Sequence, residues 1–428
     1  MERHSDVIVA GGGLAGLAAA AYLARAGRRV TVLEKAAELG GRARTRERSG
    51  FLFNVGPHAL YVAGQARAVL RDLEVPFTGQ PPLADGTFVA GRDVIEPLPA
   101  GALALLSSRL LTVGAKWELA RLLGRVPRLD PSAVDGVSLS DWLRRNVRHD
   151  SVAELLRTFF RVATFVDEPD RLSAGAAIAQ LQLALQKNVL YLDGGWQTLV
   201  DGLARRVREA GARIVTRADV GVLEHDSGRV RGVRLANGDV WTAPFVLAAL
   251  APDAVAALGG LEDDRRTARV PVRLATLDLG LAHLPRPERR AVFGLGRPLY
   301  FSVHSAVARL AREGTALVHA AYYLGDDRRP PAAIEAELLD FVDRVQPGWR
   351  AHVVERRFVP ELTVAHAMPL ASEGGLSGRP GIAVRERPGL FVAGDWVNSE
   401  GLLADAALAS ARSAAAAILR AGADVAAA

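Results

Sequence analysis

The sequence has no cysteine, few lysines and no long apolar run. The absence of cysteine from 428 residues excludes disulfides, thiolate metal sites, cysteine nucleophiles and a thioether link to a cofactor. Only three of the 53 basic residues are lysines, so arginine carries nearly all the positive charge of a chain with a formal net charge of +6. No stretch reaches the roughly 18 uninterrupted apolar residues that indicate a membrane-spanning helix.

The other absences concern partners and location. The nine histidines are scattered rather than spaced as ligands, so we predict no metal site. No basic run is interleaved with aromatic residues, so we expect no nucleic-acid partner, although the arginines leave peripheral contact with anionic membranes open. Residues 1–6 are polar and show no signal-peptide pattern, so a cytoplasmic location is expected. The sequence does not predict an oligomeric state.

A glycine motif near the N-terminus is the most informative pattern in the chain. The apolar run 7–10 predicts a buried strand, and the Ala- and Leu-rich stretch 14–26 predicts a helix. Between them, Gly11, Gly13 and Gly16 form G-x-G-x-x-G. These glycines permit a tight turn, close approach of a pyrophosphate and close packing of helix on strand. The helix N-terminus then presents free N–H groups to phosphates.

A second predicted strand, over 29–33, ends on an acidic residue. Glu34 follows the third glycine at about the 20-residue separation found in dinucleotide-binding units. A carboxylate there accepts hydrogen bonds from an adenosine ribose and repels a 2′-phosphate. The segment therefore predicts a dinucleotide-binding β-α-β unit. Its expected cofactor contacts are Gly11, Gly13, Leu14, Ala15, Gly16, Glu34 and Lys35.

A second motif, G-G-R-A-R-T, follows at residues 40–45. Here the sequence resembles the FAD-dependent amine oxidase and phytoene desaturase superfamily, in which such a segment lies along the FAD pyrophosphate. The resemblance implies that Gly41, Arg42 and Thr45 do so here. Glycine allows the close approach, and an arginine can bind phosphate oxygens with both branches of its guanidinium.

The resemblance extends over nearly the whole chain. The segment 51–58 ends in Gly56, Pro57 and His58, and resembles a family segment that runs from a strand to the flavin ring. Further along, the resemblance implies that backbone near Val220 meets the adenine.

The second half of the resemblance lies near the C-terminus. A predicted strand ends on Gly394 and Asp395, and a helix is predicted from Leu403. The resemblance implies that Asp395 accepts hydrogen bonds from the ribityl hydroxyls. It also implies that the helix N-terminus at Leu403 and Ala404 faces the flavin N1–C2=O edge, where its dipole stabilises negative charge.

Together these signals predict an α/β fold. We expect a Rossmann-like FAD-binding domain of the glutathione reductase type, interleaved with a mixed-sheet substrate domain and a helical cap. FAD is expected to be bound noncovalently. The expected boundaries place the FAD domain in 1–75, 191–255 and 386–428, the helical cap in 76–190 and the substrate sheet in 256–385.

The catalytic residues are less clearly marked. His58, Tyr300 and His304 are our candidates for the reactive face of the flavin. Because Tyr300 and His304 are four positions apart, they share one face of a strand. A proton donor there would assist isomerisation or protonate a carbanion. The alternative is that both are polar residues satisfied within the sheet.

The predicted reaction follows from one difference between this sequence and the amine oxidases of the superfamily. Amine oxidases of the superfamily commonly carry a lysine near flavin N5, but no lysine follows Lys187, so the pattern is closer to the phytoene desaturase and carotenoid isomerase branch. We therefore expect an FAD-dependent oxidoreductase of an apolar small molecule, acting by hydride transfer to N5 or by double-bond isomerisation. An amine or porphyrinogen oxidase and a non-catalytic flavin-binding protein remain alternatives. The substrate is expected to enter through 100–186, where arginines at the rim favour an anionic membrane.

Overall fold

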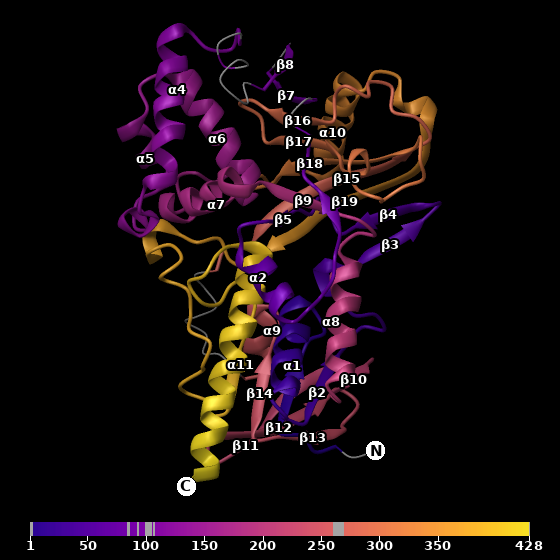
Figure 1. Cartoon of the computed structure of the whole chain (residues 1–428), viewed down its shortest axis with the longest axis vertical. Coiled ribbons are helices and arrows are strands. Elements are labelled where there is room, and N and C mark those ends of the chain that lie inside the picture. The colour runs from indigo at the N-terminus through magenta and orange to yellow at the C-terminus, as the bar shows by residue number, and fades with distance from the viewer. Residues whose placement is uncertain are drawn as a thin grey trace.

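The computed structural model describes residues 3–83, 86–91, 94–98, 105, 108–259 and 269–427. Figure 1 shows an elongated molecule with a parallel sheet and its helices toward one end. A mixed sheet and a group of four helices lie toward the other end. In the described part of the chain, every helix is too short or too polar to cross a membrane.

The parallel sheet is assembled from three separate stretches of the chain. Its order is β10-β2-β1-β14-β20, and each neighbouring pair is parallel. The strands are short, and the three inner ones are almost wholly buried, as expected for a sheet covered on both faces. The strands are β1 (Val7–Ala10), β2 (Val30–Glu34), β10 (Arg213–Thr216), β14 (Phe245–Ala248) and β20 (Leu390–Val392).

Helices cover one face of this sheet and a small sheet covers the other. Val9 and Val32 pack into a core with the helices, whereas Ile8 and Leu33, on the opposite face, pack with the small antiparallel sheet. The helices are α1 (Leu14–Arg25), α2 (Gln65–Asp72), α8 (Gln197–Glu209) and α11 (Leu403–Ala427). The small sheet contains β11 (Val220–Asp226), β12 (Arg229–Leu235) and β13 (Val240–Thr242). The short helix α9 (Pro252–Ala257) follows β14.

A seven-stranded mixed sheet forms the second unit, in the order β19-β15-β18-β17-β16-β7-β8. The helix α10 (Pro331–Val345) packs on one face, where Leu277, Val318 and Phe301 join its core. The opposite face carries a polar row, because Ser302 pairs with His319, and His319 pairs with Asp278. The strands are β7 (Thr87–Ala90), β8 (Ile95–Pro97), β15 (Val272–Leu281), β16 (Ala291–Gly294), β17 (Leu299–Val303), β18 (Ala316–Tyr323) and β19 (Val353–Ala365).

Four helices form a layer beside the mixed sheet (Figure 1). They share a core in which Trp142 meets Phe160 edge to face. The helices are α4 (Val113–Arg125), α5 (Leu139–Asn146), α6 (Asp150–Thr164) and α7 (Ala174–Lys187). The connecting strands are β3 (Thr45–Arg48), β4 (Phe51–Asn54), β5 (Leu60–Tyr61), β6 (Gly79–Gln80) and β9 (Val189–Leu192). The predicted fold class, with its interleaved domains and helical cap, is confirmed; the exact domain boundaries remain a prediction.

Candidate functional site

A cavity of about 590 Å³ runs from the carboxyl ends of β1 and β2 toward the mixed sheet. It lies where the parallel sheet changes the direction of its connections, the usual ligand position in such sheets. Most of the predicted cofactor residues line it, although they come from distant parts of the chain. They are Gly11, Gly13, Leu14, Ala15, Glu34, Lys35, Gly41, Arg42, Pro57, His58, Gly394, Asp395, Leu403 and Ala404.

The start of α1 fits an anionic ligand. Gly13 is the N-cap residue and supplies no side chain, and the first turn holds no acidic residue, so the helix N-terminus faces the cavity with no side-chain cap among the described residues. Gly11 has a φ of +106°, which strongly favours glycine. A Cβ on Gly16 would lie 1.9 Å from the carbonyl oxygen of Gly11, so Gly16 sets the close approach of α1 to β1 rather than lining the cavity.

Glu34 holds the glycine loop that precedes α1 in place. Its Oε2 accepts a hydrogen bond from the Gly12 N–H at 2.7 Å, and its Oε1 accepts one from the Ala36 N–H at 2.8 Å. Each carboxylate oxygen keeps a further lone pair for a ligand hydroxyl. Glu34 therefore both orders the glycine loop and borders the cavity.

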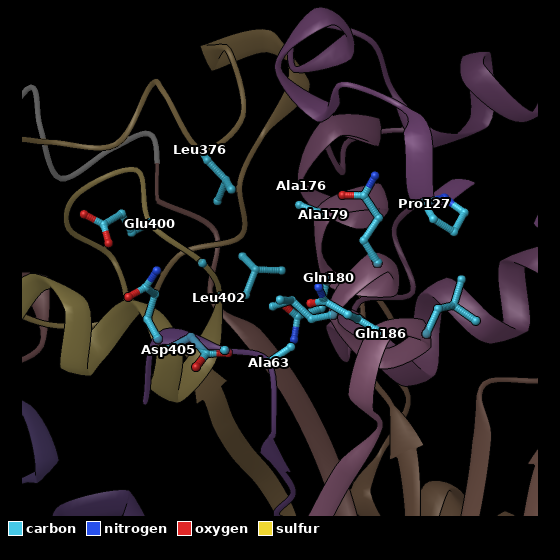
Figure 2. Close-up of a pocket in the computed structure, with 16 residues that line it drawn as sticks. Ala63, Pro127, Ala176, Ala179, Gln180, Gln186, Leu376, Glu400, Leu402 and Asp405 are labelled. Atoms are coloured by element: carbon cyan, nitrogen blue, oxygen red, sulfur yellow. The ribbon is translucent and has the colours of Figure 1, made fainter. Parts of the chain in front are cut away.

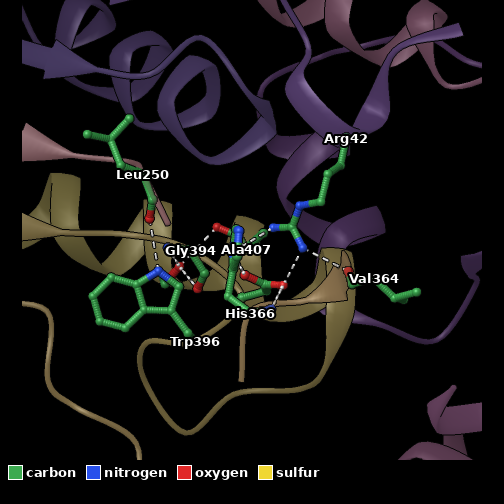
Figure 3. Close-up of polar contacts among 9 residues, drawn as sticks. Arg42, Leu250, Val364, His366, Gly394, Trp396 and Ala407 are labelled. Atoms are coloured by element: carbon green, nitrogen blue, oxygen red, sulfur yellow. Dashed lines mark hydrogen bonds and ion pairs between the residues drawn. The ribbon is translucent and has the colours of Figure 1, made fainter. Parts of the chain in front are cut away.

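Arg42 and Asp395 form an ion pair. Figure 3 shows the Arg42 side chain between Val364 and His366. The Arg42 guanidinium lies 2.8 Å from Asp395 Oδ2 and also donates to the carbonyl oxygen of Val364. His366 adds its backbone N–H at 3.1 Å and its Nδ1 at 2.9 Å to the same carboxylate. Arg42 and His366 together hold the pKa of Asp395 well below its usual range despite its burial.

This network adds a protein partner to two of the predicted cofactor residues. Arg42 is expected along the pyrophosphate and Asp395 at the ribityl hydroxyls; both line the cavity and pair with each other, and their contacts with the cofactor remain predictions. The physical reason is that a carboxylate only 2% exposed needs a counter-charge, and Arg42 supplies it. No motif indicates His366, which directly follows the long strand β19.

The strand end before Asp395 is fixed by two further contacts in Figure 3. Ser410 of α11 exchanges hydrogen bonds of 3.0 Å with the N–H and the carbonyl oxygen of Gly394. The indole of Trp396 donates to the carbonyl oxygen of Leu250 at 3.0 Å. These contacts tie β20, α11 and the end of β14 together beneath the cavity floor.

His58 borders the middle of the cavity in its neutral form. Its Nδ1 lies 3.0 Å from the carbonyl oxygen of Gly56, so Nδ1 carries the proton and Nε2 is an acceptor. Burial lowers its pKa to about 4, and the positive charge of Arg42 adds to the shift. Its ring packs against Trp196 at 4.9 Å, a contact that no motif had signalled.

Three other predicted cofactor residues lie outside the cavity lining. Thr45 donates to Asn54 Oδ1 at 2.6 Å and accepts from the Gln197 N–H, so it joins the β3–β4 hairpin to α8. Gly56 adopts φ +81° at the turn that positions His58. Val220 packs at the edge of the core between the parallel sheet and the small sheet. Their contacts with the cofactor remain predictions.

Tyr300 and His304 lie behind the cavity rather than on it, which corrects the expectation that they face it. The strand β17 ends at Val303, and His304 begins a short turn of 3-10 helix. Both side chains do share one side: the His304 ring stacks on Tyr191 at 3.8 Å, and the Tyr300 and Tyr191 hydroxyls lie 3.4 Å apart. His304 is 1% exposed, and neither of its ring nitrogens has a hydrogen-bond partner. Their role in catalysis remains a prediction.

The end of the cavity toward the mixed sheet is mostly apolar. It is bordered by side chains from β5, the end of α6, β15 and β19, which only the tertiary fold brings together. They are Tyr61, Phe165, Leu274, Leu362 and Val364. The cavity thus combines a polar half suited to a dinucleotide with an apolar half suited to a second molecule.

Comparisons with known proteins agree with this geometry. The profile of flavin-containing amine oxidoreductases matches residues 14–419. A hydroxyneurosporene desaturase of Cereibacter sphaeroides is 28% identical over 280 residues, covering 56% of this chain and 55% of that protein. A Mycobacterium tuberculosis protein assigned as a flavin-containing monoamine oxidase is 30% identical over 268 residues, covering 58% and 57%. The matches span little more than half the length of these relatives.

Solved structures share the fold over almost the full chain. An oxidoreductase from Methanosarcina mazei superposes with a TM-score of 0.78 at 20% identity, covering 95% of this chain and 99% of that one. Putrescine oxidase bound to putrescine superposes with a TM-score of 0.74 at 15% identity, covering 97% and 99%. At these identities the likeness establishes the fold alone. The profile match is what establishes kinship: this chain belongs to the flavin-containing amine oxidoreductase family.

Proposed function

We propose that the protein is an FAD-dependent oxidoreductase that oxidises or isomerises an apolar small molecule, with FAD held noncovalently in the large cavity. The supporting observation is the two-part lining of that cavity. Its polar half has the uncapped start of α1 and Glu34, and its other half has Phe165, Leu274 and Leu362. The absence of cysteine from the chain removes a thioether link.

The residues present fit a flavin dinucleotide. The backbone N–H groups at the start of α1 would bind its pyrophosphate, and Glu34 would bind its adenosine ribose. The N-terminus of α11, at Leu403 and Ala404, would place its positive dipole end toward the ring. When bound, the flavin supplies the redox chemistry by accepting a hydride at N5.

The side chains around the reacting end exclude water and hold protons in defined places. Phe165, Leu274 and Leu362 cover a bound apolar molecule. His58 is neutral at pH 7 because its pKa is about 4, and its Nε2 is an acceptor rather than a donor. His58 therefore accepts a hydrogen bond or a proton and does not act as a general acid.

Anaerobic reduction of the flavin tests the proposal. Apolar polyenes or other apolar alkenes, added to the yellow protein without oxygen, are expected to bleach the flavin absorbance or to emerge with a moved double bond. Small polar amines are expected to leave both unchanged. Bleaching by small amines with no response to apolar alkenes would contradict the proposal and favour an amine oxidase.

We also propose that α4 brings the protein to an anionic membrane surface, where apolar substrates collect. Val113 and Trp117 are one helical turn apart, and their side chains are 72% and 75% exposed. The basic residues Arg121 and Arg125 are exposed on the same helix. Its acidic residue, Glu118, is buried and bound to His149. An exposed tryptophan beside basic residues suits the headgroup region of anionic lipid.

Vesicle sedimentation tests this surface. Binding to phosphatidylglycerol vesicles is expected to exceed binding to phosphatidylcholine vesicles, and Trp117→Ala and the double variant Arg121→Glu/Arg125→Glu are each expected to reduce it severalfold. The matched control is Arg205→Glu/Arg208→Glu on α8, whose arginines are also exposed. An equal loss of vesicle binding in the control would show that the effect comes from the net charge of the protein and not from α4. Undiminished binding by Trp117→Ala would contradict the proposed contact.

A further inference from the structure

A second cavity, of about 530 Å³, adjoins the first between the helical layer and the parallel-sheet unit. Figure 2 shows its lining. One wall comes from α7, and the facing wall comes from the segment before α2 and from the start of α11. Much of the lining is apolar, as Ala176, Leu183 and Leu402 illustrate.

Asp405 is one of the polar residues of this lining, beside Glu400 and several glutamines. Its side chain is in the first turn of α11 and is 3% exposed. Its Oδ1 accepts a hydrogen bond from the Ala66 N–H at 2.6 Å, which caps α2. Two glycines make room for it: a Cβ on Gly64 would lie 2.2 Å from Oδ1, and a Cβ on Gly401 would lie 2.9 Å from its Cβ.

No cation of the described residues forms an ion pair with Asp405, unlike Asp395 in the neighbouring cavity. Burial raises the pKa of Asp405 to about 6, and the Ala66 hydrogen bond offsets only part of that shift. The carboxyl group is therefore ionised at pH 8, and among the described residues only the N-terminus of α2, and no charged side chain, balances it. Such a group gains from a ligand that donates a hydrogen bond to it.

Gln180, in the wall formed by α7, has an amide hydrogen-bond donor that is not fully used. It is 2% exposed, and its Nε2 makes no hydrogen bond of normal geometry, although it lies near enough to the Tyr61 hydroxyl to offset part of the rise in the pKa of Tyr61. The other carboxylate of the lining, Glu400, pairs with Arg412 at 3.3 Å and is thus already balanced. The cavity accordingly presents a carboxylate with no charged side-chain partner among the described residues, Asp405, and an amide whose donor is not fully used, Gln180.

The two cavities meet at Asp405, which lines both. Leu402 lines the second cavity, and the next residue, Leu403, lines the first. Likewise, Tyr61 lines the first cavity and Ala63 lines the second. The two cavities are therefore neighbours that share Asp405 as a wall residue.

We propose that the second cavity binds a terminal hydroxyl group of an elongated, otherwise apolar substrate, through Asp405 and Gln180. A hydroxyl donates one hydrogen bond and accepts another, so it satisfies both residues at once. An ammonium group would satisfy Asp405 but cannot accept from Gln180, and a carboxylate would be repelled by Asp405. This assignment rests on the proposed function, which supplies the apolar substrate. It adds that one end of that substrate carries a hydroxyl group.

Calorimetric titration of the oxidised FAD-loaded protein at pH 8 tests the assignment, with three probes of equal chain length: 1-octanol, octylamine and octanoate. We expect 1-octanol to bind most tightly. Asp405→Asn and Gln180→Leu are each expected to weaken it about tenfold, the loss typical of one such hydrogen bond. The matched control is Glu118→Gln, a buried carboxylate that also accepts backbone N–H bonds but lines neither cavity.

Several results would overturn the assignment. Tighter binding of octylamine than of 1-octanol would show that the cavity binds a cation. An unchanged affinity for 1-octanol in both variants would show that the cavity binds it through apolar contacts alone. An equal loss in Glu118→Gln would trace the effect to folding, which a melting curve of each variant measures separately. Because no turnover is needed, apolar alkenes that fail to bleach the flavin would sink the proposed function while leaving an Asp405-dependent hydroxyl site standing.

Discussion

The buried carboxylates of this protein differ in what balances their charge. Asp395 faces Arg42 and His366, and Asp278 faces His319 and Arg357. Asp405 has one backbone N–H and, among the described residues, no ion-pair partner. A residue that is costly to ionise in the folded state is retained more readily where a ligand uses it.

The cost of Asp405 is measurable as a pH-dependent stability. Its folded pKa of about 6 lies above the ordinary 3.8, so the native state binds the proton more tightly, and stability falls as pH rises through this interval. Asp405→Asn removes the penalty and keeps an acceptor for the Ala66 N–H. In urea unfolding we expect this variant to gain up to about 3 kcal/mol at pH 8, since two pKa units correspond to roughly that energy.

The advantage of Asp405→Asn should shrink toward zero as the pH is lowered below 3.8, where the aspartate is mostly protonated in both the folded and the unfolded chain. A variant less stable than the parent at pH 8, or an advantage independent of pH, would contradict the described environment of Asp405.

Glu34 gives a second residue-level prediction. Glu34→Ala removes the acceptor of the Gly12 and Ala36 N–H groups together with the expected ribose contact. Loss of a charge-assisted hydrogen bond costs about 1.5–3 kcal/mol, so FAD affinity should fall roughly tenfold to hundredfold. Glu38→Ala is the control, because the Glu38 side chain is 61% exposed and pairs with Arg46. Equal FAD occupancy after dialysis of the two variants would refute the role of Glu34.

At the scale of elements, the close packing of α1 against β1 places the N-terminus of α1 at the first cavity. Gly16→Ala would place a methyl group 1.9 Å from the Gly11 carbonyl oxygen, so the helix must shift. Overpacking of this kind costs about 1–3 kcal/mol, and we expect a lower melting temperature together with weaker FAD retention. Gly124→Ala in α4 is the control, because a Cβ there meets no atom within 4 Å. Unchanged FAD retention in Gly16→Ala would show that the close approach is not needed.

Elements with local signals could be predicted from the sequence. The glycine motif, the strand ending on Glu34 and the helix from Leu403 depend on turn chemistry and short-range pattern, and the structure has each of them. The strand predicted over residues 299–303 is also present as β17, but the placement of His304 on that strand was wrong. His304 continues the alternation of Tyr300 and Ser302, but the chain turns at Val303, and no glycine or proline marks that turn.

At the scale of the whole molecule, the site depends on contacts between distant segments. Arg42 and Asp395 are 353 positions apart, and each belongs to a motif, yet no motif indicates that they pair with each other. His366 and Phe165 reach the first cavity only because the mixed sheet and helical layer pack against the parallel-sheet unit, whereas Trp196 lies within that unit at the start of α8. The sequence thus predicted the polar half of the cavity and left the apolar half, and the whole second cavity, to the tertiary fold.

The central claim is that the first cavity binds FAD noncovalently, and acid precipitation of the purified yellow protein tests it most directly. With no cysteine available for a link, we predict that the flavin passes into the supernatant, with FAD at one equivalent per chain. Flavin that stays with the pellet would reveal a covalent bond through another residue, and a protein that takes up no FAD on reconstitution would contradict the assignment of the cavity.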